Sequence, residues 1–154
     1  MDLILWRHAE AEDSFPDQDR KLTGKGEKQA AKMAAWLKTY LPADARILVS
    51  PTVRTRQTAA ALTQKGTVAE EVGTGTSVAA LLGIAGWPDA KGAVVVVGHQ
   101  PTLGQVAAYL LSDTQESWNI KKGAIWWFSN RTRLGETQTV LRAALSPEFL
   151  EMPL

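Results

Sequence analysis

Two histidines are the residues of this 154-residue chain best suited to chemistry, because each follows a short apolar run. His8 comes after the run Leu3–Trp6 and Arg7. His99 follows the valine-rich run Ala93–Val97 and one glycine. Apolar runs this short are typical of buried strands. Ligands bind outside the carboxyl ends of the strands in an open parallel sheet, so we expect both imidazoles at one edge of a sheet.

Arginines are expected at the same edge. A third predicted strand, Arg46–Val49, leads into a helix that carries Arg54 and Arg56. Guanidinium groups match phosphate oxygens, and helix N-termini supply backbone N–H donors to anions. A single histidine after a strand is more often structural, and a helix arginine such as Arg56 is usually solvated. The convergence of three strand ends, with Arg7 among them, favours a site for a phosphoryl group.

A metal site is the competing chemical interpretation. His8, Glu10, Glu12 and His99 are residue types that could bind zinc or manganese. The sequence has no His-Glu-x-x-His helix, and arginines beside the histidines would repel a cation. It also has no cysteine, which excludes thiolate metal sites, disulfides and cysteine nucleophiles. We therefore expect a site without a metal or other cofactor.

Composition and charge narrow the function classes. Hydrophobic residues make up 45% of the chain and charged residues 21%, which is typical of a globular protein with a core. Seventeen basic and 16 acidic residues give a net charge of +1, which offers no bulk attraction to nucleic acid or to an anionic membrane. No apolar window is long enough to span a bilayer, and the N-terminus does not resemble a secretory signal. We expect one cytoplasmic domain over residues 1–154.

The order of the predicted elements indicates the fold. Short strands alternate with helices, which favours an α/β three-layer sandwich with a mainly parallel central sheet and helices on both faces. The last two strands are expected to be partly antiparallel around a polar turn at 129–137. Besides the three strands above, the pattern predicts helices at 27–40, 53–65, 77–84 and 102–111, and strands at 68–72, 124–128 and 139–144.

Four ordered segments between residues 3 and 101 resemble motifs of the histidine phosphatase superfamily, also called the phosphoglycerate mutase-like superfamily. Arg-His-Ala at the end of the first strand is similar to its Arg-His-Gly signature, and the short length and Arg-His-Ala-Glu-Ala start are most similar to SixA-type phosphohistidine phosphatases. The other three segments are Arg20–Gly26 with Gln29-Ala30, Ser50–Thr58, which matches Ser-Pro-x-x-Arg-x-x-Gln-Thr, and Val97–Pro101.

The resemblance implies a phosphoglycerate mutase-like fold and a role for each matching residue. His8 would be the nucleophile that becomes phosphorylated. Arg7, Arg54 and His99 would surround the phosphoryl group, with His99 protonated. Arg20 and Thr23 would border the pocket.

Two departures from the family pattern carry information. Ala9 stands where the signature has glycine, which predicts an ordinary backbone conformation there. Many relatives place an acidic proton donor after the strand that corresponds to the one predicted at 68–72, but residues 72–77 contain no carboxylate. Glu70 and Glu71 precede that stretch and would need a shift in register to serve.

These observations predict a metal-independent phosphatase that acts through a phosphohistidine intermediate. The connection at 73–92 is too short for a large cap, so an open rim is expected that admits a phosphorylated protein. The predicted substrate is phosphohistidine on a partner protein such as a histidine phosphotransfer or phosphocarrier domain. A phosphatase or mutase acting on a small phosphorylated metabolite is the alternative, and a catalytically silent phospho-ligand binding module is the third hypothesis.

Overall fold

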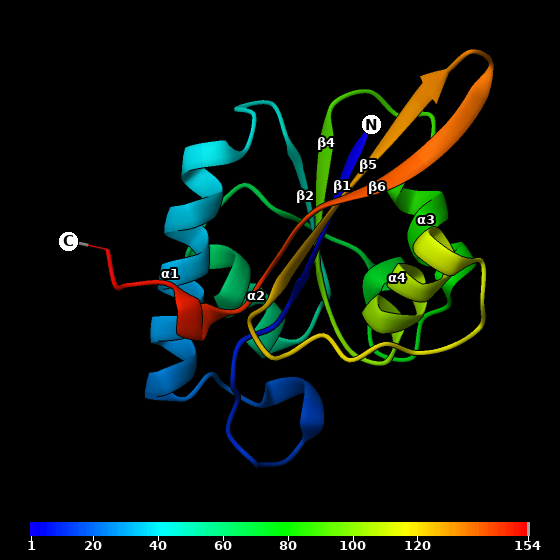
Figure 1. The fold of residues 1–154 in the computed structure, drawn as a ribbon. Coiled ribbons are helices and arrows are strands. Elements are labelled where there is room, and N and C mark those ends of the chain that lie inside the picture. The colour runs from blue at the N-terminus through cyan, green and yellow to red at the C-terminus, as the bar shows by residue number, and fades with distance from the viewer. Residues whose placement is uncertain (154) are drawn as a thin grey trace.

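The fold is built on one six-stranded sheet. A computed structural model describes residues 1–153. Its strands lie in the order β3-β2-β4-β1-β5-β6, and β3, β2, β4 and β1 run parallel while β5 and β6 are antiparallel (Figure 1). The predicted antiparallel closing pair is therefore confirmed. The strands are β1 (Asp2–Arg7), β2 (Arg46–Val49), β3 (Thr67–Val68), β4 (Ala93–Gly98), β5 (Ile125–Arg133) and β6 (Glu136–Leu145).

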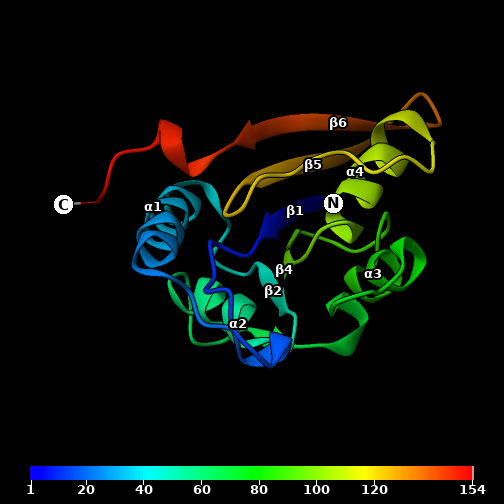
Figure 2. The same ribbon diagram turned by 90° about the horizontal axis from the view of Figure 1, so that it is seen from below.

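Helices cover both faces of the sheet, as predicted. Alternate residues of β1 point to opposite faces: Leu3 and Leu5 pack with α3 and α4, while Ile4 and Trp6 pack with α1 and α2. Figures 1 and 2 show these two helix pairs on the two sides of the sheet. The helices are α1 (Gly24–Tyr40), α2 (Val53–Ala60), α3 (Val78–Ala85) and α4 (Thr102–Ser112), with short 3₁₀ turns η1 (Asp17–Asp19), η2 (Glu70–Val72) and η3 (Pro147–Phe149).

The strand register brings the ends of β1, β4 and β2 to one edge. Arg7 of β1 pairs with Gly98 of β4, so the next residues, His8 and His99, leave the sheet side by side. The His8 N–H donates to the Gly98 carbonyl at 3.1 Å. On the other side of β4, the Ser50 N–H donates to the carbonyl of Val97 at 3.1 Å. The sheet itself therefore positions the two imidazoles.

Two predicted elements are shorter in the structure. The strand predicted at 68–72 is only Thr67–Val68, because the chain then turns into η2 and carries Val72 into the core packed by α3 and α4. The helix predicted at 53–65 ends at Ala60. The N–H groups of residues 61 and 62 bond carbonyls three residues back, which closes the last turn.

The closing hairpin is longer than predicted. Strands β5 and β6 continue through the polar stretch 129–137, and the turn lies at Leu134 and Gly135, which both have positive φ. Polar residues can continue these strands because the distal part of the hairpin extends beyond the helix layers (Figure 1). Within residues 1–153, no helix is long and apolar enough to cross a membrane.

Candidate active site

His8 is held in a single tautomer. Its Nδ1 lies 2.7 Å from the carbonyl oxygen of Ala9. A carbonyl only accepts, so Nδ1 carries the proton and Nε2 keeps a free electron pair. Burial lowers the pKa of His8 to about 3; the Ala9 bond opposes this shift, and nearby positive charges add to it. The ring is therefore neutral at pH 7, which is the form that can attack phosphorus.

His99 lies beside His8, with ring centroids 5.3 Å apart. Its Nδ1 is 3.4 Å from an Nη2 donor of Arg54, and its Nε2 is 2.7 Å from the Ser50 hydroxyl. Guanidinium only donates, so Nδ1 accepts and Nε2 carries the proton. Burial, followed by the charge of Arg54, lowers the pKa of His99 to about 4. His99 is therefore neutral in the free protein at pH 7, because burial next to arginine disfavours a second cation. The expected protonated His99 refers to the site with a phosphoryl group bound and stays a prediction.

Arg54 is buried on the first turn of α2 and bonds a loop on the far side of the site. Its Nη1 donates to the Asp17 carbonyl at 2.8 Å, and its Nη2 donates to the Asp17 carboxylate at 3.1 Å. Burial opposes the ionisation of Asp17, but its bonds to Arg54 and then Arg20 lower its pKa overall. Arg56, two residues along α2, is exposed. The helix phase therefore brings Arg54 to the histidines and leaves Arg56 in solvent.

Arg7 closes the other side of the site. Its Nη1 donates to the carbonyl of Ile120 at 2.9 Å, and burial lowers the pKa of Arg7. The Nε atoms of Arg7 and Arg54 are buried and have no hydrogen-bond partner among residues 1–153. Buried donors normally have partners. Each arginine therefore keeps one hydrogen-bond donor that no other described residue uses.

Arg20 and Thr23 border the site indirectly. Arg20 donates to the Glu12 carbonyl at 2.6 Å and to the Asp17 carboxylate at 3.3 Å, so it meets Arg54 only through Asp17. Thr23 is the N-cap of α1: its hydroxyl accepts from the Gly26 N–H and donates to the Glu10 carboxylate. The structure therefore gives Thr23 a capping role at the base of α1.

Three further side chains assemble the site, and sequence reasoning had not given them roles there. Ser50 orients His99, and Asp17 holds Arg54. Thr58 accepts from the Ala9 N–H at 3.1 Å and donates to the carbonyl of Arg54 at 2.8 Å, which ties the His8 loop to α2. Ser50 and Thr58 lie inside the Ser-Pro-x-x-Arg-x-x-Gln-Thr motif, which was the available signal for them. The φ of Ala9 is negative, as its replacement of glycine predicted.

The metal ligands considered from the sequence do not form a cluster. Glu10 bonds Thr23, and Glu12 is exposed on the loop. In the described part of the chain, no three histidine, aspartate or glutamate side chains gather in a way that could hold a metal ion. The histidines are instead grouped with the guanidinium groups.

Comparisons with known proteins agree with this arrangement. The profile of the histidine phosphatase superfamily (branch 1) matches residues 3–73, which include His8 and Arg54. The chain belongs to this superfamily. This histidine phosphatase is 36% identical to an uncharacterised protein of Picosynechococcus, over 97% of this chain and 99% of that protein. It is 32% identical to an uncharacterised protein of Mycobacterium tuberculosis, over 69% and 70% of the two chains.

Solved structures place the phosphatase in the same fold. A proposed phosphohistidine phosphatase SixA from Nakamurella multipartitia is 29% identical with a TM-score of 0.77, and 95% of each chain is covered. The protein histidine phosphatase SixA complexed with tungstate is 25% identical with a TM-score of 0.74, over 96% of this chain and 97% of that one. The predicted phosphoglycerate mutase-like α/β fold is confirmed. Phosphatase activity is the activity that these findings support.

The carboxylates around the phosphatase site are poorly suited to donate a proton. Glu70 and Glu71 lie in η2 and are exposed, and residues 72–77 contribute no carboxylate. Asp17 is close to the site, but its pKa is lowered and its oxygens face guanidinium groups. His8 and His99 are 6% and 4% exposed, and the Asp17 carbonyl beside them accepts from Arg54 of α2.

Proposed function

We propose that this protein is a metal-independent phosphatase that removes the phosphoryl group from phosphohistidine on a partner protein, through a covalent phosphohistidine at His8. The proposal combines a nucleophile, a set of donors for the phosphoryl oxygens and a substrate class. Each is supported by a different feature of the site.

The nucleophile is the Nε2 atom of His8. The bond from Nδ1 to the carbonyl of Ala9 fixes the tautomer, so the electron pair of Nε2 is available without any proton transfer. Burial keeps the ring neutral. A positioned, neutral imidazole needs no general base before it attacks phosphorus.

Arg7, Arg54 and His99 would bind the phosphoryl oxygens. Phosphoryl transfer depends mainly on positioning and on stabilising the charge that spreads over these oxygens. The Nε donors of both arginines have no partner among residues 1–153, which leaves them available to phosphoryl oxygens. A dianionic phosphoryl group beside His99 would raise the pKa of that ring and favour a proton on Nδ1 in the complex.

The proposed substrate class rests on the absence of a suitable general acid for the leaving group. An alkoxide leaving group needs a positioned general acid, and in residues 1–153 the carboxylate that contacts the site arginines is Asp17, whose pKa is lowered. An imidazole leaving group is less demanding, because its P–N bond is labile once the nitrogen is protonated, even by solvent. The site therefore suits phosphohistidine better than a phosphate ester.

The two chemical steps balance without a cofactor. His8 Nε2 forms a bond to phosphorus while the P–N bond of the substrate breaks, and the released imidazole takes a proton from solvent. Water then attacks phospho-His8 and gives a proton back to solvent, the new P–N bond breaks, and inorganic phosphate leaves. His8 returns to its neutral form.

A matched pair of substrates tests this function. We would compare kcat/KM for a phosphohistidine peptide, a phosphoserine peptide of the same sequence and a panel of sugar phosphates, with His8→Ala as the control. Phosphohistidine should be preferred, with stoichiometric release of inorganic phosphate. A sugar phosphate that is preferred tenfold or more, about 1.4 kcal/mol in barrier, would overturn the substrate assignment. Transfer to a second metabolite without free phosphate would show a mutase.

A further inference from the structure

A basic hollow of about 560 Å³ opens beside Arg7, outside the histidine site. Six cationic side chains line it: Arg7, Lys25, Lys28, Lys32, Lys121 and Lys122. We call it the lysine pocket. Among residues 1–153, the acidic side chains that line it are Glu10 and Glu148 alone, so a chain with a net charge of +1 concentrates its positive charge here.

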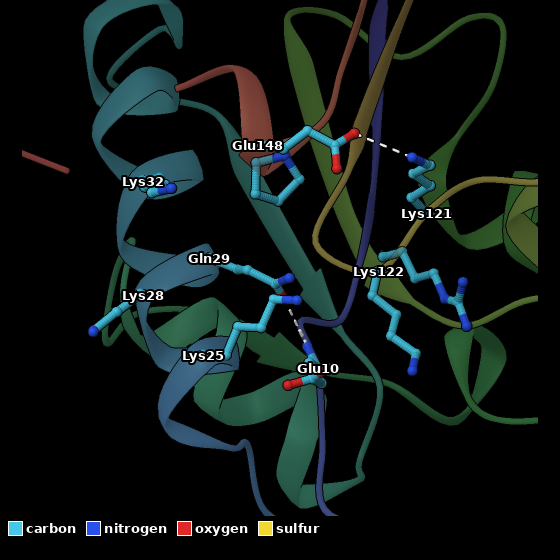
Figure 3. Close-up of a pocket in the computed structure, with 10 residues that line it drawn as sticks. Glu10, Lys25, Lys28, Gln29, Lys32, Lys121, Lys122 and Glu148 are labelled. Atoms are coloured by element: carbon cyan, nitrogen blue, oxygen red, sulfur yellow. Dashed lines mark hydrogen bonds and ion pairs between the residues drawn. The ribbon is translucent and has the colours of Figure 1, made fainter. Parts of the chain in front are cut away.

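Two walls bring these lysines together. Lys25, Lys28 and Lys32 are spaced three and four residues apart, which places them along one side of α1. Lys121 and Lys122 form the opposite wall. In Figure 3, Lys25 extends from α1 toward Glu10, Lys122 lies on the opposite wall, and Lys28 points away from the hollow.

The second wall is attached to the catalytic strand. The N–H of Gly123 donates to the carbonyls of Arg7 and His8 at 3.1 and 3.0 Å, directly after the lysine pair. Gly123 has a φ of +76°, and a Cβ there would collide with Pro147. The position of Lys121 and Lys122 is therefore fixed relative to the nucleophile by two backbone bonds.

Most of this positive charge is not neutralised within the fold. Lys121 pairs with Glu148 at 3.1 Å, and the Glu10 carboxylate accepts from the Thr23 hydroxyl. In the described part of the chain, the other four lysines of the pocket form no ion pair. Four of the five lysines are exposed. Like charges gathered at a surface repel one another, and an anionic partner removes that repulsion.

We propose that the lysine pocket binds acidic side chains that flank the phosphohistidine on the partner protein, an inference that rests on the proposed function. Small ligands are usually held in enclosed, largely apolar pockets. This hollow is instead lined by long, solvated cations, which suit the carboxylates of a protein surface. Charge complementarity of this kind sets partner choice and association rate.

Charge-matched peptides and variants test the pocket. Two phosphohistidine peptides of equal length would be used, one flanked by glutamates and one by glutamines. Their kcat/KM values would be compared for the wild type, for Lys25→Gln/Lys121→Gln/Lys122→Gln and for a control with the same charge change. The control, Lys38→Gln/Lys65→Gln/Lys91→Gln, removes three exposed lysines that do not line the pocket.

The wild type and the control should prefer the glutamate peptide about tenfold at low salt, and the pocket variant less than threefold. The preference should weaken as salt is added. If the wild type turns over both peptides without a preference, the proposed role of the lysine pocket is refuted while the proposed function stands. An equal loss of preference in both variants would refute that role as well. Turnover of neither peptide, with an active sugar phosphate or other phosphate ester, would refute the proposed function and this inference with it.

Discussion

Acidification from pH 7 to pH 5 should destabilise the folded protein, because it buries both of its histidines in neutral form. Burial is the main cause that lowers the pKa of His8 to about 3 and that of His99 to about 4. In the unfolded chain both rings return to an ordinary pKa of about 6.5. Between these values the unfolded state binds more protons. The stability from neutral burial is thus fully present above pH 6.5 and is lost as the pH falls.

The size of the effect follows from these values. At pH 5 an unfolded histidine is about 1.5 units below its pKa, and each unit corresponds to about 1.4 kcal/mol. Each ring therefore lowers the free energy of unfolding by about 2 kcal/mol, and the two together by about 4 kcal/mol. The chain has only two histidines, so no third imidazole contributes. Most carboxyl groups titrate below this window.

Urea unfolding at pH 7 and pH 5, in buffer without phosphate, measures this difference. His99→Asn should lose about half of the pH dependence, since only His8 then titrates. The imidazole proton resonances of the folded wild type should not shift between the two pH values. A change in the free energy of unfolding below about 1 kcal/mol between the two pH values would refute the claim that both histidines are buried in neutral form. So would a His99→Asn variant whose stability depends on pH as strongly as that of the wild type.

The remaining predictions concern catalysis. His8→Ala should abolish turnover without unfolding the protein, and acid-quenched wild type should carry base-stable, acid-labile phosphate; full activity of the variant would exclude the mechanism. Arg54→Ala should lower kcat/KM and so raise the activation barrier by about 3 kcal/mol, and Arg56→Ala, at an exposed position, should raise it by much less. Equal losses would contradict the assignment of Arg54 as the arginine that faces the histidines. Asp17→Asn should tighten inhibition by inorganic phosphate a few-fold, since the exposed carboxylate competes for Arg54; weaker inhibition would argue against competition. Activity should survive EDTA and be inhibited by vanadate, and loss in EDTA with recovery on adding a divalent ion would favour a metal site.

The buried strands and the place of the site were predictable from the sequence. The apolar runs that became β1 and β4 have hardly any polar residue, because helices cover both of their faces. Once these runs are taken as parallel strands, His8 and His99 must leave the sheet at the same edge. The positions of His8 and His99 directly after two parallel strands therefore predict that these side chains, 91 positions apart in the sequence, lie close together.

Features that depend on distant contacts were not predictable. Val72 looked like the end of a strand, but it turns inward because α3 and α4 provide its apolar surroundings. The hairpin beyond residue 129 lacks an apolar face, so no hydrophobic alternation marks it. The contact of Asp17 with Arg54 joins residues 37 positions apart, and no local pattern indicates it.

The place of β1 between β4 and β5 has a consequence for protein synthesis. Among the described strands β1 is made before its two neighbours, which are the fourth and fifth of the six, so it stays unpaired until β4 (Ala93–Gly98) has been made. A nascent or truncated chain ending before residue 93 carries His8, Arg54 and most of the motifs, yet has no strand to place against β1. We therefore expect no phosphatase activity from such a fragment, and an exposed apolar strand that a chaperone would recognise.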